Sequence, residues 1–112
     1  MATHPAQHAA SSAAAFRLVA EDGHLAAEGP LTFASARRAW ELGEPFFAGT
    51  GAAREVDCRG ITASDSAGLA VLLEWLGTAR HAGRNLRYTH LPSGLAALAR
   101  ISEVEEFLTR GV

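Results

Sequence analysis

The chain of 112 residues contains no lysine, so all ten of its basic residues are arginine. A single cysteine, Cys58, excludes an internal disulfide and is typical of a protein in a reducing compartment. No apolar run approaches the roughly 18 residues of a membrane-spanning helix. The net charge of -2 gives no electrostatic reason to expect nucleic acid or an anionic membrane as a partner. We therefore expect one small cytoplasmic domain that neither binds nucleic acid nor inserts into a membrane.

Residues 1–15 differ in composition from the rest of the chain. They are rich in alanine and contain Pro5 and two histidines but no arginine. A secretory signal needs a basic start and a leucine-rich middle, which this stretch lacks. We therefore predict a disordered N-terminal tail over residues 1–15 and one folded domain over residues 16–112.

Hydrophobic periodicity predicts alternating strands and helices. Two short runs on either side of Asp22-Gly23 indicate a β-hairpin. The predicted strands cover 16–20, 24–28, 54–58 and 85–90, and the predicted helices cover 31–42, about 66–81, a stretch from 92–93 onward, and 102–109. The order β-β-α-β-α-β-α-α favours an α/β sheet with parallel crossovers and an antiparallel hairpin at one edge.

The helix predicted from Leu31 to Leu42 has Phe33, Ala36 and Trp40 at helical spacing, which predicts an inward-facing stripe. Thr32 or Ser35 is expected to cap its start, and Gly43 followed by Pro45 is expected to end it. In the next helix, leucines at positions 69, 72, 73 and 76 form one apolar stripe.

That stripe leaves other residues of the second helix nearer its outer side, namely Ser66, Ala67, Ala70, Glu74 and Trp75. A tryptophan on an outer face is a typical anchor of a protein interface. Trp75 can also pack within its own domain, and the pattern alone does not choose between these positions.

Nothing in the sequence specifies a catalytic centre. The five histidines have no Cys or carboxylate partners at ligand spacing, so we expect no metal. No phosphate-binding loop is present, and Gly49-Thr50-Gly51 precedes a predicted strand rather than following one. Cys58 is expected to be a buried, inert thiol. We therefore expect neither a cofactor nor an enzymatic activity.

The segment Thr62-Ala63-Ser64-Asp65-Ser66-Ala67-Gly68-Leu69 is predicted to form a strand-to-helix junction. Ser64 or Asp65 can cap the helix, and a carboxylate is favourable at that end. The Ser66 hydroxyl is expected near free backbone N–H groups, a place that suits a phosphate or an acceptor of a partner protein. Without further context, the pattern favours a capping motif with no further role.

The stretch from Val56 to Leu69, with Asp65-Ser66-Ala67-Gly68-Leu69 at its end, resembles the signature of the STAS family. That family takes its name from sulfate transporters and anti-sigma factor antagonists. The resemblance spans about residues 16–110 and implies a STAS fold, with a mixed sheet of four to five strands and helices mainly on one face. Ala67 stands where antagonists usually carry a second hydroxyl, so the segment is more similar to the MlaB-like STAS subunit of the bacterial Mla phospholipid transporter.

This resemblance implies an accessory subunit that binds the cytoplasmic ATPase of an ABC-type phospholipid transporter, which maintains outer-membrane lipid asymmetry. Such a protein would be cytoplasmic and peripheral to the inner membrane through its partner. The expected partner-binding residues are Asp65, Ser66, Ala67, Ala70, Glu74 and Trp75. The alternative is an anti-sigma factor antagonist that binds an anti-sigma kinase and is switched by phosphorylation of Ser66.

Overall fold

The computed structural model describes residues 15–21, 24–49 and 55–111. Its strands are β1 (Arg17–Glu21), β2 (His24–Leu31), β3 (Glu55–Ser64) and β4 (Arg87–Thr89), and its helices are α2 (Ala36–Ala48), α3 (Ser66–His81), α4 (Ser93–Ile101) and α5 (Glu105–Arg110). This order confirms the predicted β-β-α-β-α-β-α-α arrangement. Nearly all of the predicted N-terminal tail lies outside the described residues.

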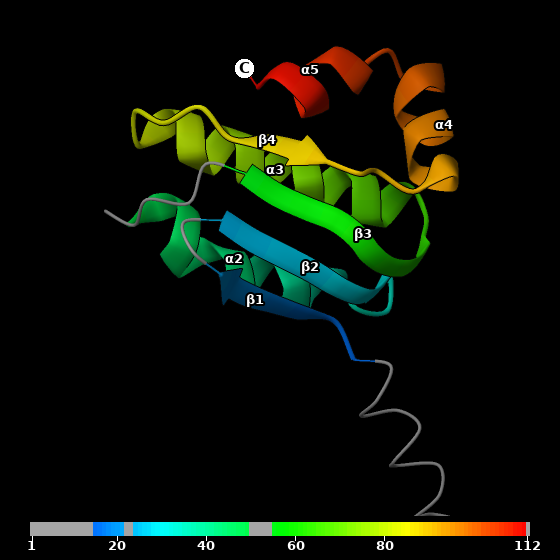
Figure 1. The fold of residues 1–112 in the computed structure, drawn as a ribbon, viewed down its shortest axis with the longest axis horizontal. Coiled ribbons are helices and arrows are strands. Elements are labelled where there is room, and N and C mark those ends of the chain that lie inside the picture. The colour runs from blue at the N-terminus through cyan, green and yellow to red at the C-terminus, as the bar shows by residue number, and fades with distance from the viewer. Residues whose placement is uncertain (1–14, 22–23, 50–54, 112) are drawn as a thin grey trace, which may run out of the picture.

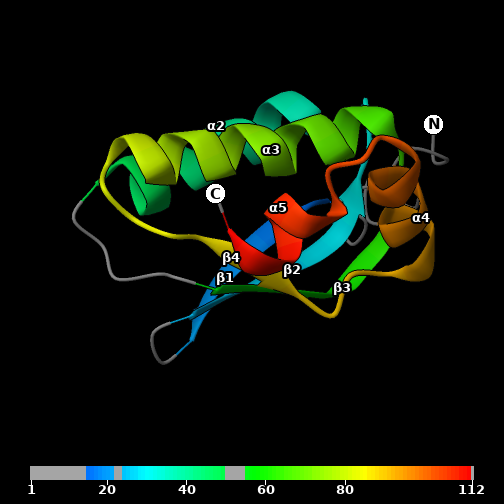
Figure 2. The ribbon, with the colours of Figure 1, turned by 90° about the horizontal axis from the view of Figure 1, so that it is seen from above.

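The four strands form one mixed sheet in the order β1-β2-β3-β4 (Figure 1). β1 runs antiparallel to β2, whereas the β2–β3 and β3–β4 pairs are parallel. Helices α2 and α3 lie side by side on one face of the sheet, and α5 lies beside β4 (Figure 2). Among the described elements, no helix covers the opposite face. The antiparallel edge hairpin and the one-sided helical layer are thus as predicted.

Strand alternation separates the core from the open face of the sheet. Leu25 and Ala27 of β2 and Val56 and Cys58 of β3 are buried beneath the helices. Side chains at the alternate positions point to the open face and pair across the strands, with Arg17 bound to Glu28 and Glu55 bound to Arg87. Opposite charges on facing positions favour this register, although exposed pairs contribute little stability.

The boundaries predicted for the first helix are wrong. Residues 32–35 form a turn, and α2 begins at Ala36 and continues through Pro45 to Ala48. A proline inside a helix costs about 3 kcal/mol because it removes one hydrogen bond and crowds the preceding turn. Phe47, which is fully buried, offsets much of this cost at about 1.5–3 kcal/mol, and Phe46 packs against the same core. Tertiary packing therefore extends the helix past its local stop signals.

Two strands and the last helix also differ in length from the prediction. β3 continues to Ser64, well past the predicted end at Cys58, because it pairs with β2 up to Leu31. β4 is only three residues long, and α5 starts at Glu105 rather than at Ser102. In the part of the chain that the structure describes, no helix is long and apolar enough to cross a membrane.

Candidate functional site: the start of helix α3

The junction between β3 and α3 is organised by the carboxylate of Asp65. Asp65 is the N-cap residue of α3, and its Oδ1 accepts the backbone N–H of Gly68 at 3.0 Å. Its Oδ2 accepts the backbone N–H of Phe33, in the loop between β2 and α2, at 3.0 Å. These hydrogen bonds, first that from Phe33 and then that from Gly68, hold the pKa of Asp65 below its ordinary value. One carboxylate thus caps α3 and fixes a second loop beside it, which confirms the predicted cap.

A close backbone contact fixes the same junction. A Cβ atom placed on Gly68 would lie 2.0 Å from the carbonyl oxygen of Leu31, at the end of β2. Real Cβ atoms do not approach a backbone oxygen so closely, so only glycine allows α3 to start against β2. The glycine of the Asp-Ser-x-Gly-Leu segment therefore has a packing reason that is independent of any ligand.

The structure places most of the predicted site residues on the outer side of α3. Ser66, Ala70 and Glu74 are exposed, and Ala67 is half-buried. The described residues supply no hydrogen-bond partner for the Ser66 side chain, which stands in the first turn of α3. We call the surface formed by Asp65, Ser66, Ala67, Ala70 and Glu74 the α3 face. It consists of small side chains with a carboxylate at each end.

The expectation that Trp75 lies on the outer side of α3 is wrong. Trp75 is only 1% exposed, and its ring lies 5.3 Å from that of Phe47 and 6.1 Å from that of Phe16, measured between centroids. A Cβ on Gly43 of α2 would lie 2.2 Å from its Nε1, so α2 packs directly over the indole. Trp75 thus belongs to the core and is not part of the partner surface.

Buried Trp75 also carries an unsatisfied polar group. Its indole N–H has no hydrogen-bond partner within the described residues. An unpaired buried donor costs about 1–3 kcal/mol, which the burial of the large ring must outweigh.

The sequence pattern missed two exposed aromatic residues, one in the turn before α2 and one on α2. Phe33 is 83% exposed and Trp40 is 41% exposed, although both were expected to face inward. Because α2 starts only at Ala36, Phe33 lies in the preceding turn and outside the helical stripe. The sequence does contain a signal for this start, because Ser35 is a better residue to precede a helix than Pro30.

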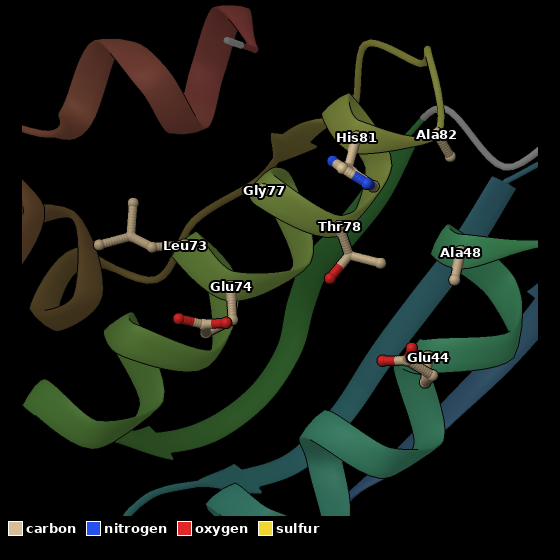
Figure 3. Close-up of a pocket in the computed structure, with 8 residues that line it drawn as sticks. All are labelled: Glu44, Ala48, Leu73, Glu74, Gly77, Thr78, His81 and Ala82. Carbon is tan, nitrogen blue, oxygen red and sulfur yellow. The ribbon is translucent and has the colours of Figure 1, made fainter.

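Helices α2 and α3 also border a surface groove of about 630 Å³ (Figure 3). The side chains of Glu44 on α2 and of Glu74, Thr78 and His81 on α3 project around it. Two carboxylates give the groove an acidic rim. It is an open groove, and no hydrogen bond pairs a hydroxyl with a base among the residues that line it.

Two further reactive groups, the Cys58 thiol and the Asp57 carboxylate, lie on β3 away from the α3 face. Burial, assisted by the nearby charge of Asp57, raises the pKa of the Cys58 thiol to about 12, so this cysteine is not a nucleophile at neutral pH. On the open face, Asp57 pairs with Arg59 at 3.1 Å and with His90 at 3.2 Å. Partial burial raises the pKa of Asp57, but the hydrogen bonds from Arg59 and the charges of Arg59 and His90 outweigh it and lower the pKa overall. Within the described ranges, no three His, Cys, Asp or Glu side chains gather as metal ligands.

A mixed four-stranded sheet with this helical layer and this strand-to-helix junction defines a STAS domain. The chain belongs to the STAS family whose model is described as "Mlab, STAS domain", which matches residues 14–110. Proteins of this kind are generally non-catalytic and regulatory, and they act by binding partner proteins.

A solved structure titled "Structure of the Anti-Sigma Factor Antagonist SpoIIAA in its Unphosphorylated Form" is similar in fold. The two chains share 14% identity with a TM-score of 0.58, and the similarity covers 86% of each chain. At this identity the likeness supports the fold alone. No curated protein matches the chain.

Proposed function

We propose that this chain is a non-catalytic accessory subunit that binds the cytoplasmic ATPase of an ABC-type phospholipid transporter and supports its assembly and activity. The transporter would maintain outer-membrane lipid asymmetry. The protein would be cytoplasmic and lie against the inner membrane through its partner. The match to the MlaB-like family model over residues 14–110 carries this choice of partner.

The α3 face supports a docking role. Ala67 and Ala70 are small, so a partner helix can approach the α3 backbone closely. Ser66 offers a hydroxyl beside the first backbone N–H groups of the helix, which can bind an acceptor of the partner. Since Trp75 is buried, Trp40 on the neighbouring helix α2 is the better candidate for an aromatic anchor.

The second candidate is an anti-sigma factor antagonist whose partner is an anti-sigma kinase. The specific observation in its favour is the accessible Ser66 hydroxyl, which a kinase could reach. The two functions differ in partner class, so binding to a purified partner separates them.

The decisive experiment measures calorimetric binding of the chain to the candidate ATPase. Ser66→Asp should weaken binding by about 2 kcal/mol or more, because it places an unpaired charge in a desolvated contact. Ser66→Ala removes the hydroxyl without adding a charge, so it should weaken binding by less, about 1 kcal/mol. Circular dichroism should show both variants folded, since an acidic residue at a helix start is favourable.

Wild-type binding to the anti-sigma kinase but not to the ATPase would reject the transporter function. If both Ser66 variants bind the ATPase as tightly as wild type does, the contact lies elsewhere on the chain. The chain alone should not hydrolyse ATP, and turnover that a point substitution abolishes would contradict its non-catalytic role.

A further inference from the structure

Phe33 stands out among the large apolar side chains of the described residues. Its side chain is 83% exposed, more than Ile101, Phe107 or Trp40. An exposed phenyl ring is stabilised when it is removed from water, so it is a strong potential contact for another protein.

The turn that carries Phe33 is firmly held. Asp65 accepts the Phe33 N–H at 3.0 Å, and the Ser35 hydroxyl accepts the Thr32 N–H at 3.0 Å while donating to the carbonyl of Pro30 at 2.7 Å. The exposed ring is therefore presented on a preorganised backbone, which reduces the entropy lost on binding.

The charges next to this turn suggest the chemistry of the occupant. Arg37 and Arg38 lie in the first turn of α2, which has no acidic residue. Cations are unfavourable at a helix N-terminus, where the helix dipole is positive. Within the part of the chain that the structure describes, Arg37 pairs with Glu41 at 3.4 Å and Arg38 has no ion pair. Because these two cations are unfavourable where they stand in the free chain, a partner surface that carries carboxylates would stabilise them.

We propose that Phe33, Arg37 and Arg38, here called the α2 entry, form a second contact with the partner: the ring enters an apolar pocket rimmed by carboxylates on the ATPase subunit. Asp65 is the positioning residue, because its carboxylate links the turn of Phe33 to the start of α3. This inference rests on the proposed function and names a further part of its interface.

Calorimetry with the purified full chain and ATPase tests the α2 entry. Phe33→Ala should weaken binding at least about tenfold. Arg37→Ala/Arg38→Ala should weaken it about fivefold at low salt and flatten its salt dependence. Ile101→Ala and Arg110→Ala are matched controls, exposed side chains of α4 and α5 that should leave affinity unchanged.

A double-mutant cycle tests Asp65. Asn also caps helices well, so Asp65→Asn should keep the cap but turn an amide NH₂ toward the Phe33 N–H and break the link. It should weaken binding clearly more in the wild-type background than in the Phe33→Ala background. Equal weakening in both backgrounds would mean that Asp65 contacts the partner directly, which overturns its positioning role.

The outcomes separate the two proposals. If wild type binds the ATPase and Ser66→Asp weakens it, but Phe33→Ala binds normally, the α2 entry is rejected and the proposed function stands. If wild type does not bind the ATPase, both are rejected. If the chain instead binds vesicles of anionic phospholipid and loses that binding in the α2 entry variants, the occupant is a membrane and the inference is overturned.

Discussion

Two glycines in helix interiors provide a sharp test of the packing between α2 and α3. Gly43 lies in α2 and Gly77 in α3, and both can be replaced by alanine without backbone strain. A Cβ at Gly77 would meet no atom within 4 Å. A Cβ at Gly43 would lie 2.2 Å from Nε1 and 2.6 Å from Cε2 of Trp75. The same substitution therefore has opposite expected effects at the two positions.

The magnitudes follow from helix propensity and from overpacking. Alanine stabilises a helix interior by about 0.5–1 kcal/mol relative to glycine, and Gly77→Ala should gain this amount. At Gly43 the ring of Trp75 has to shift although it is enclosed by Phe16 and Phe47, and such overpacking costs about 1–3 kcal/mol. Gly43→Ala should thus lose up to about 2.5 kcal/mol net.

Urea unfolding followed by circular dichroism measures both variants. In a Trp75→Ala background the indole ring that meets the new methyl group is absent. Gly43→Ala should then be neutral or stabilising, with a coupling free energy of at least about 1 kcal/mol. A Gly43→Ala variant as stable as Gly77→Ala would refute this account of the α2–α3 contact.

Three further predictions concern stability. Trp75→Ala should lose about 3–5 kcal/mol in urea unfolding, and a loss below about 1 kcal/mol would contradict its core position. Tyr88→Phe removes the hydrogen bond from the Tyr88 hydroxyl to the Leu72 carbonyl at 2.6 Å and should lose about 1 kcal/mol of stability. Unchanged stability would show that this bond does not stabilise the fold. Burial raises the pKa of Cys58 from 9.0 to about 12, so the thiol of the folded chain stays neutral at pH values where that of the unfolded chain ionises. The stability that this burial contributes is therefore fully present below pH 9 and is lost as the pH rises toward 12. The Cys58 thiol should resist alkylation at pH 8 until urea unfolds the chain, and rapid native reaction would contradict its burial.

Periodicity predicted the order of elements and the helix from Ser66 to His81 because both signals are local. Leucines recur at helical spacing over several turns, and Asp65 provides a cap directly before them. The boundaries of α2 and β3 could not be predicted in the same way. β3 reaches Ser64 only because β2 pairs with it, and α2 passes Pro45 only because the aromatic residues beyond it are buried.

The sequence by itself thus determined the fold class and the strand-to-helix junction around Asp65 and Ser66. Only the tertiary structure decided which tryptophan is buried. Trp75 lies on the flank of α3, where a helical pattern leaves its burial open, and α2 covers that flank because Gly43 lets the helices approach closely. Trp40 and Phe33 stay exposed because α2 begins at Ala36 and turns its buried side toward α3 and the sheet. Burial on a helix flank depends on neighbouring elements, and these are distant in sequence.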